Sequence, residues 1–286
     1  MFGFLNVYKP TGKTSHDVVA VLRRVTKIKQ IGHTGTLDPF AEGVLPICIG
    51  KATRLIEYLK DDKAYIGTIQ FGSSTTTYDT EGEIVKTSDK IVTQEDVEDC
   101  LKYFRGEIEQ LPPIYSAIKV NGKKLYEYAR EGQKVKIEPR KVTIFELELV
   151  NFDIQKQQAE VKIVCSKGTY IRSIANDLGE KLGVFGHLIK LVRIKAGEFY
   201  VENSIKLEDL NTVEVVLSNL IYPTEKLNFM IYNLDNEEKK RISNGMVIIP
   251  NQQFKNDEYV ILMDNEKLAA ITKFDGKFLK CEKVFL

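Results

Sequence analysis

A glycine-rich loop holds the aspartate that is best placed to do chemistry in this chain of 286 residues. The loop reads GHTGTLDPFAEG and runs from Gly32 to Gly43. Its glycines allow tight turns or a close backbone approach to a ligand, and Pro39 favours an extended conformation for Asp38. An aspartate held in such a loop suits a nucleophile or an electrostatic stabiliser. In an isolated Asp-Pro pair, however, an aspartate that only caps a turn is the commoner case.

Other catalytic signatures are incomplete or absent. Gly12-Lys13-Thr14 matches the end of a phosphate-binding P-loop, but Val7 stands where that pattern needs a glycine. No G-x-G-x-x-G opens a helix, and no G-x-S-x-G is present. The three histidines and four cysteines are not spaced as metal ligands are. We therefore expect no cofactor and no metal.

The composition is that of a folded protein without an export or membrane signal. Apolar residues make up 43% of the chain and charged residues 28%. The amino terminus lacks the basic flank and apolar stretch of a signal peptide, and no apolar run approaches the roughly 18 residues of a membrane span. The dispersed cysteines predict buried or free thiols in a reducing compartment. These features predict a cytoplasmic protein.

The net charge of +1 is unevenly distributed along the chain. Residues 1–60 hold nine Lys/Arg against four Asp/Glu, residues 112–145 hold eight against three, and residues 162–197 hold seven against two. If these segments converge in space, they form a basic face that attracts a polyanion. Solvated lysines that share no direction are an equally good interpretation of the charge alone.

Turn signals and apolar spacing predict the elements that position the loop. A helix begins at Thr14 or Ser15, with Asp17 in its first turn and four valine and leucine side chains at helical spacing. Strands are not separated by regular helices, which favours an α+β fold with a largely antiparallel sheet. The expected strands are 2–8, 45–49, 64–71, 142–152, 158–165 and 188–194, and the expected helices are 14–25, 52–59, 93–104 and 170–182.

A domain boundary is expected near residues 222–230, around Pro223. Beyond it, residues 241–250, 259–264 and 268–274 have the pattern of short strands separated by Asn-Gly, Asp-Asn and Asp-Gly turns. The spacing predicts a small all-β module of about 60 residues.

The motifs together resemble those of the TruB family of tRNA pseudouridine synthases. Several separate motifs match in the family's order, so chance agreement is a poor explanation. They span residues 3 to 193, whereas the likeness of the last module to a PUA domain rests mainly on Ser243-Asn244-Gly245 and strand spacing. The matching segments are Lys9–Ser15, Gly32–Pro39, Tyr65, Pro112–Lys119, Leu125–Gly132, Ser166–Ser173 and Gly186–Arg193.

The resemblance implies a fold, a domain plan and a reaction. The fold would be the pseudouridine synthase fold, a curved and largely antiparallel mixed sheet flanked by helices and loops, with a small all-β PUA-like domain at the C-terminus. Residues 1–225 would form the catalytic domain, with a basic RNA-gripping insertion at 112–141, and residues 226–286 the PUA-like RNA-binding domain. The substrate would be uridine-55 in the T-loop of tRNA, isomerised without any external reagent.

The resemblance also assigns roles to particular residues. Asp38 would be the catalytic carboxylate, and Arg172 would pair with it and keep it ionised against the effect of burial. Tyr65 would stack on the flipped base and is a candidate proton acceptor. Tyr170 and Leu191 would line the substrate pocket. His33 would help to receive the folded RNA loop. Taken singly, each of these residues also fits an ordinary structural position.

Three other functions compete with this one. A nucleoside or glycoside hydrolase would need a second carboxylic acid, and the sequence offers only Glu42 as a weak candidate. A non-catalytic RNA-binding or tRNA-folding protein would not require Asp38, Tyr65 and Arg172. A subunit of a guide-RNA particle would carry extra tails, whereas this chain starts almost at its first motif. We therefore expect an enzyme that acts as a monomer on the T-loop and stem of tRNA, without a guide RNA, a protein partner or a membrane.

Overall fold

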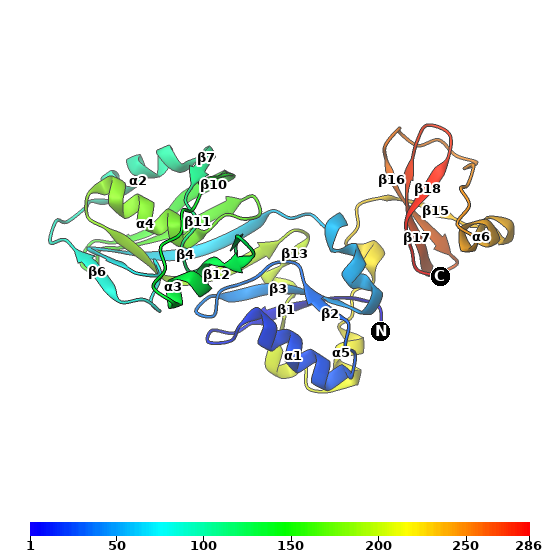
Figure 1. The fold of residues 1–286 in the computed structure, drawn as a ribbon, viewed down its shortest axis with the longest axis horizontal. Coiled ribbons are helices and arrows are strands. Elements are labelled where there is room, and N and C mark those ends of the chain that lie inside the picture. The colour runs from blue at the N-terminus through cyan, green and yellow to red at the C-terminus, as the bar shows by residue number, and fades with distance from the viewer.

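The computed structural model describes all residues from 1 to 286 and contains one large sheet, one small sheet and two further pairs of short strands (Figure 1). The large sheet has ten strands, and its main path runs β14-β1-β3-β12-β4-β11-β10-β7, with β2 paired to β3 and β13 paired to β12. Its strands are β1 (Gly3–Lys9), β2 (Ile31–His33), β3 (Glu42–Ile49), β4 (Lys63–Phe71), β7 (Gly106–Gln110), β10 (Arg140–Asp153), β11 (Gln158–Cys165), β12 (Gly186–Ala196), β13 (Phe199–Tyr200) and β14 (Ile205–Lys206).

Most neighbouring strands of this sheet are antiparallel, and only the β1–β14 and β3–β12 pairs are parallel. The predicted α+β class with a largely antiparallel mixed sheet is therefore confirmed. The β3–β12 pair joins the two halves of the sheet and places the loop before β3 beside β12. Register shifts in the β12–β4 pairing flank this junction, as bulges near functional sites often do.

Helices cover each half of the large sheet (Figure 1). Helices α1 (Ser15–Thr26) and α5 (Val213–Ser218) lie together beside the half that contains β1 and β3, while α2 (Gln94–Leu101) and α4 (Ile171–Leu182) lie together beside the other half. Thr14 caps α1 as predicted, and Asp17 in its first turn also closes a capping box with it. Gly183 ends α4 in the left-handed conformation, at the end of the predicted range 170–182.

Short 3-10 helices complete the large part of the chain. They are η1 (Gly50–Tyr58), η2 (Lys102–Phe104), η3 (Val201–Asn203), η4 (Leu207–Asp209) and η5 (Pro223–Glu225). The helix expected at 52–59 is therefore present as η1, and the helix expected at 93–104 consists of α2 followed by η2. The four cysteines are free thiols, as predicted, and three of them are buried.

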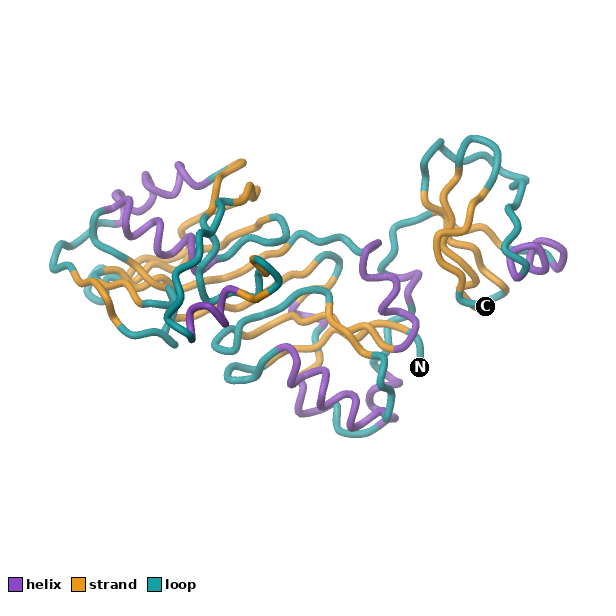
Figure 2. Tube along the Cα trace, in the orientation of Figure 1, coloured by secondary structure: helices purple, strands orange, loops and turns teal.

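The basic segment 112–141 lies in the connection between two hydrogen-bonded neighbours, β7 and β10. It leaves the edge of the sheet, is mostly loop (Figure 2), and returns to the same edge. Within it lie β8 (Lys119–Val120), β9 (Lys123–Lys124) and α3 (Leu125–Arg130). A second excursion contains the paired strands β5 (Ser73–Thr75) and β6 (Ile84–Thr87), in a region the sequence marked only as polar and rich in turns.

The small sheet has the order β15-β16-β17-β18. Its elements are β15 (Met230–Asn233), α6 (Asn236–Ser243), β16 (Tyr259–Asp264), β17 (Lys267–Phe274) and β18 (Leu279–Val284). The strand predicted at 241–250 is wrong, because its first residues belong to α6. Asp235 caps that helix with Glu238 in a capping box, and Asn244-Gly245 ends it instead of turning a hairpin.

The small sheet packs against the large part of the chain. A buried apolar cluster includes Phe4, Leu55 and Phe199 on one side and Ile271 and Phe285 on the other. Lys51 and Arg54 on η1 donate hydrogen bonds to the carbonyl oxygens of Phe285 and Val284, at 2.9 and 2.8 Å. None of the helices combines the length and the apolarity that a bilayer crossing requires.

We predict that Phe285→Ala loosens this contact. The Phe285 ring is 7% exposed, packs on Phe2 with a centroid distance of 5.4 Å, and lies beneath the Arg54 guanidinium. Its loss should lower the free energy of unfolding, measured by chemical denaturation, by about 3 kcal/mol. Leu286→Ala is the matched control, because Leu286 is 45% exposed and should cost under about 0.5 kcal/mol. Equal effects of the two changes would contradict the packing described.

Candidate active site

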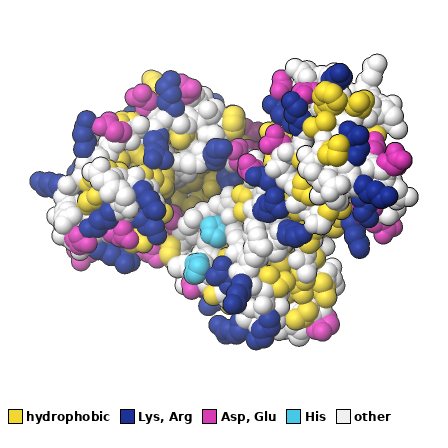
Figure 3. All heavy atoms as spheres, turned by 45° about the vertical axis from the view of Figure 1, so that its right-hand side comes forward, with side chains coloured by type: hydrophobic (Ala, Val, Ile, Leu, Met, Phe, Trp, Pro, Cys, Tyr) yellow, Lys and Arg dark blue, Asp and Glu magenta, His cyan; other side chains and the backbone are white.

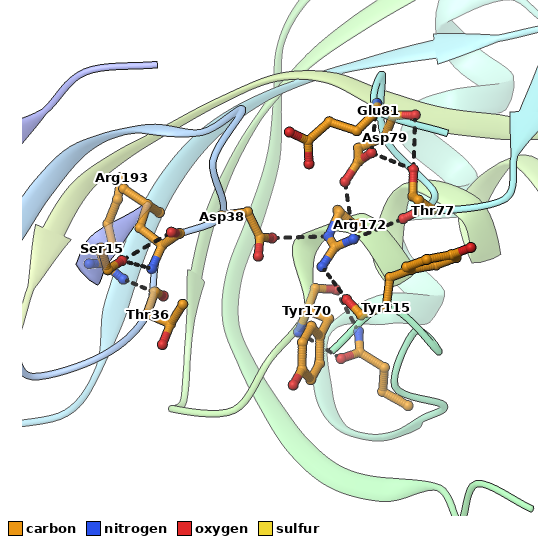
Figure 4. A network of polar contacts seen from close by, with 12 residues as sticks. Ser15, Thr36, Asp38, Thr77, Asp79, Glu81, Tyr115, Tyr170, Arg172 and Arg193 are labelled. Atoms are coloured by element: carbon orange, nitrogen blue, oxygen red, sulfur yellow. Dashed lines mark hydrogen bonds and ion pairs between the residues drawn. The ribbon is translucent and has the colours of Figure 1, made fainter. Parts of the chain in front are cut away.

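The loop that carries Asp38 connects β2 to β3 and is fixed from β12 by Arg193. This arginine is 1% exposed. Its Nε donates to the carbonyl oxygen of Val44 at 2.6 Å, and Nη1 and Nη2 donate to those of Thr36 and Gly35 at 3.3 and 3.2 Å (Figure 4). One buried guanidinium thus spans the loop on both sides of the aspartate.

Two elements near the amino terminus hold the residues that flank the aspartate. The Ser15 hydroxyl, at the start of α1, donates to the carbonyl oxygen of Leu37 at 3.0 Å and accepts from its N–H at 2.8 Å. The carbonyl oxygen of Pro39 accepts from the Gly12 N–H at 2.8 Å and from Lys9 Nζ at 3.3 Å. The loop is therefore a fixed support for the carboxylate, which is what an electrostatic or nucleophilic role requires.

Gly43 is the one loop glycine whose lack of a side chain is decisive. It lies between β1 and β12, with a φ of +108°. A Cβ placed there would lie 2.3 Å from the carbonyl oxygen of Arg193. Only glycine permits the close approach that brings Arg193 under the loop.

Arg172 lies in the first turn of α4 and meets Asp38 inside the protein. Its side chain is 6% exposed, and Nε lies 3.0 Å from Asp38 Oδ2. Nη1 donates to the carbonyl oxygen of Thr77 at 3.0 Å, and Nη2 to that of Tyr115 at 3.1 Å (Figure 4). The pair expected from the sequence motifs is thus brought together by separate elements.

A second carboxylate holds Arg172 from the opposite side. Asp79 is fully buried, and its Oδ2 lies 3.0 Å from Arg172 Nη1. Its other oxygen accepts hydrogen bonds from the Thr77 hydroxyl and, at 2.9 Å, from the Glu81 N–H. The guanidinium is therefore oriented by a carboxylate that is itself fully engaged.

The site therefore holds a second carboxylate, Asp79, which contacts Arg172 as Asp38 does. Sequence reading missed Asp79 because it lies in a polar loop rich in threonine, where an aspartate usually caps a turn. Glu42, the candidate considered instead, does not line the cavity that Asp38 faces. Asp79 does not line it either, and it accepts hydrogen bonds at both oxygens. It is placed to orient Arg172, not to protonate a leaving group.

Burial and charge act in opposite directions on Asp38. Burial raises the pKa of its carboxyl, the positive charges of Arg172 and Lys9 lower it, and the negative charge of Asp79 raises it. The net shift is upward. Arg172 therefore offsets only part of the rise in the pKa of Asp38 that burial causes.

Asp38 and Arg172 face a cavity of about 290 Å³. Tyr65 on β4, Leu191 on β12 and Tyr170 at the start of α4 also line it. Tyr65 is 8% exposed, and burial raises the pKa of its hydroxyl while the nearby charge of Arg193 lowers it. Five of the six residues singled out in the sequence thus share one cavity.

His33 is the exception, since it lies on β2 and does not line the cavity. Burial is the main cause that lowers the pKa of its imidazole, and its Nδ1 is buried without a hydrogen-bond partner. Nowhere in the structure does a group of three or more His, Cys, Asp or Glu side chains assemble as a metal site would.

The three basic segments found in the sequence meet at this cavity. Its walls come from residues 34–38, from 116–117 and from 166–172 with 191 and 193. Figure 3 shows a hollow in the surface with Lys and Arg side chains on both sides of it. The sequence did not single out Lys63 and Ser116, which also line the cavity and are buried.

Comparison with known proteins places the chain in a family. Residues 23–171 match the TruB family pseudouridylate synthase N-terminal domain, and residues 172–228 match the tRNA pseudouridylate synthase B C-terminal domain. The chain belongs to the TruB family of pseudouridine synthases. The tRNA pseudouridine synthase B of Clostridium perfringens is 41% identical over 100% of this chain and 99% of its own. That of Caldanaerobacter subterraneus subsp. tengcongensis is 43% identical over 99% of each.

Two solved structures are similar in fold to this chain. A chain of a Cbf5-Nop10-Gar1 complex has a TM-score of 0.73 at 26% identity, covering 100% of this chain and 85% of its own. A chain of an H/ACA ribonucleoprotein bound to a substrate RNA has a TM-score of 0.72 at 24% identity, with the same coverage. The two TruB family matches meet at Arg172, within the first turn of α4.

We predict that Asp79→Asn moves the acidic limb of the reaction rate to lower pH. The change keeps the shape of the side chain and removes a negative charge that raises the pKa of Asp38. Asp38 should then stay ionised to lower pH. The single-turnover rate measured against pH tests this. Asp89→Asn, which removes an equal charge at an exposed position, should leave the limb in place. A limb that stays or moves upward in Asp79→Asn would contradict the arrangement.

Proposed function

We propose that the chain converts uridine to pseudouridine in tRNA, at uridine-55 of the T-loop. The observation that carries the proposal is the ion pair of Asp38 with Arg172 at the wall of a cavity that also holds two tyrosines. The TruB relatives that match the whole chain carry the name tRNA pseudouridine synthase B, which supports tRNA as the substrate. The target position rests on the motif resemblance.

The reaction breaks one bond to the sugar and makes another. The bond between uracil N1 and ribose C1′ breaks, the base turns, and a bond forms between C5 and C1′. C5 loses its proton and N1 gains one, so no external reagent is consumed. In the proposed mechanism, Asp38 supplies the negative charge that attacks or stabilises the reacting sugar or base. Tyr65 is a candidate for accepting the C5 proton.

The target base must leave the RNA stack to reach this carboxylate. The aromatic rings of Tyr65 and Tyr170 can compensate for the stacking that the base loses, and Leu191 supplies an apolar wall. Both tyrosines lie in the same cavity as Asp38. A retained base also needs a site closed to water, because water would convert the isomerase into a hydrolase.

The position and the hydrogen bonds of Asp79, the second carboxylate, argue against hydrolysis. A glycosidase acid must donate a proton to the leaving group, from a carboxyl that faces the substrate. Asp79 does not line the cavity, and both of its oxygens accept hydrogen bonds. Two carboxylates line the cavity, Asp38 and Asp61, and Asp61 is paired with Lys167.

We propose that RNA binding is shared among three further parts of the chain. Segment 112–141 would bind the RNA backbone. The carbonyl oxygen of its Tyr115 accepts a hydrogen bond from Arg172, so this segment would link RNA binding to the position of the catalytic pair. His33 would receive the folded T-loop. Residues 226–286 would form a PUA-like RNA-binding domain, and residues 1–225 the catalytic domain. The enzyme would act on the T-loop and stem as a monomer in the cytoplasm, with no guide RNA or protein partner.

We predict that the purified chain alone forms pseudouridine at one T-loop site of an unmodified tRNA transcript, in the presence of a chelator. Asp38→Asn should lower the single-turnover rate by at least about 1000-fold, because it removes the reacting charge. Mapping of pseudouridine by primer extension is the measurement. Release of free uracil would indicate a hydrolase, and tight binding without pseudouridine would indicate a tRNA-folding protein.

We predict that Arg172→Met separates turnover from binding. Arg172 contacts Asp38 and Asp79 but is 5% exposed overall, so its loss should lower the single-turnover rate by about 100- to 1000-fold and tRNA affinity by far less. Arg130→Met in the exposed insertion should have the opposite effect, lowering tRNA affinity more than the single-turnover rate. If affinity fell as far as the rate in Arg172→Met, the ion pair would not have the proposed role.

A further inference from the structure

Lys63 is a buried cation that faces the cavity of Asp38 and has no assigned role. It begins β4, two residues before Tyr65, and is 7% exposed. Its side chain passes beside the catalytic loop, where a Cβ on Gly35 would lie 3.7 Å from its Cε. Lys63 therefore brings a charge to the same enclosed space that holds the reacting carboxylate.

The ammonium of Lys63 is poorly compensated. Its only hydrogen bond is to the carbonyl oxygen of Asp61, at 3.1 Å. The two neighbouring carboxylates are already paired, Asp61 with Lys167 at 2.7 Å and Asp62 with Lys195 at 2.7 Å. Burial of an ammonium without a close anion is costly, so such a group is expected to have a ligand in the working state of the protein.

Lys9 is a useful comparison because it is also a buried lysine near Asp38. Its Nζ donates to three carbonyl oxygens, those of Pro10, Lys13 and Pro39, at 2.9, 2.6 and 3.3 Å. All the donors of Lys9 are thus used to hold the loop, whereas Lys63 uses one of three. The difference marks Lys63 as a cation that is available to a bound molecule.

The charges that face Lys63 agree with this interpretation. Burial, with the positive charge of Arg193 acting in the same direction, lowers its pKa to about 8. The charges of Asp61 and Asp62 and the thiol of Cys165 oppose that shift without cancelling it. An anion that enters the cavity would favour the charged form of Lys63 and raise its pKa again.

The proposed substrate carries such an anion at a fixed position. Each nucleotide of RNA is flanked by two phosphodiesters, and a base that turns outward into the cavity draws its own backbone to the cavity mouth. Residues 166–169 line the same cavity as Lys63, and a Cβ on Gly168 would meet open space. Uracil and ribose are neutral, so a phosphodiester is the part of the substrate that suits a buried ammonium.

We propose that Lys63 binds a phosphodiester next to the target uridine and so positions the ribose C1′ against Asp38. The inference rests on the proposed function and adds a specific contact to it. Lys63 is then a positioning residue: it holds the sugar while the base detaches and turns, which maintains the geometry that the second bond requires.

The test is a double-mutant cycle between the protein and the RNA backbone. The substrate is a synthetic T-arm stem-loop in which one phosphodiester, either 5′ or 3′ of the target uridine, is replaced by a neutral methylphosphonate. We expect Lys63→Met to slow single-turnover pseudouridine formation by about 10- to 100-fold on the native RNA. On the RNA whose contacted linkage is neutral, the same change should cost less than about 2-fold.

Lys190→Met is the matched control, because Lys190 is exposed on β12 and does not line the cavity. Its effect should be the same on native and neutral RNA. An equal loss for Lys63→Met on all substrates would overturn the proposal, since Lys63 would then act on the fold or on the C5 proton. A wild-type chain that forms no pseudouridine on native RNA would instead overturn the proposed function.

A second measurement does not depend on a folded Lys63 variant. The Asp38→Asn chain, with its lysine side chains labelled with 13C, is titrated by NMR with and without the stem-loop. We expect native RNA to raise the pKa of Lys63 from about 8, and RNA with the contacted linkage neutralised to leave it there. The same pKa with both RNAs would overturn the proposal.

Discussion

The guanidinium of Arg172 lies between two carboxylates, and the position of the Asp38 carboxylate depends on that arrangement. Asp79 fixes it from the protein interior and Asp38 meets it at the cavity wall, each at 3.0 Å. A buried aspartate without a nearby cation would tend to become protonated. An aspartate paired tightly with a cation that has no other partner would be less reactive. Arg172 pairs with both carboxylates, so its positive charge stabilises ionised Asp38 without being neutralised by Asp38 alone. Burial raises the pKa of Asp38 more than the positive charge of Arg172 lowers it.

The rest of the fold holds this arrangement in place. The parallel β3–β12 contact brings Arg193 beneath the catalytic loop, and Gly43 permits the approach. Helix α1 contributes Ser15, and the turn before it contributes Lys9. The loop is therefore supported by backbone hydrogen bonds to buried side chains, which keeps the carboxylate fixed while the cavity stays open for a base. The small sheet packs on the large part of the chain through a continuous apolar cluster.

Local signals in the sequence predicted much of this, and long-range pairing explains what they missed. The start of α1 at Thr14, the end of α4 near residue 182 and the glycine-rich loop of Asp38 depend on a few adjacent residues, and all are present. The contact of Arg172 with Asp79 joins residues 93 positions apart, and nothing around Asp79 distinguishes it from a solvent-exposed turn residue. Helix α6 was misread because Ile242 is its one buried residue, which leaves no apolar period to detect. Lys63 lies just before the strand predicted at 64–71, and no local pattern marks it as buried, because its burial depends on the distant loop that contains Gly35.

The pKa of Asp38 is the quantity that tests the shared-cation arrangement most directly. It can be read by NMR of the intact chain with 13C-labelled aspartate carboxyls, with the Asp38 signal assigned from its absence in Asp38→Asn. We expect the pKa of Asp38 to lie above that of an exposed aspartate in the wild-type chain and to rise further in Arg172→Met, because the opposing positive charge is lost. An Asp38 pKa that stays the same or falls in Arg172→Met would contradict the claim that Arg172 keeps the catalytic carboxylate ionised.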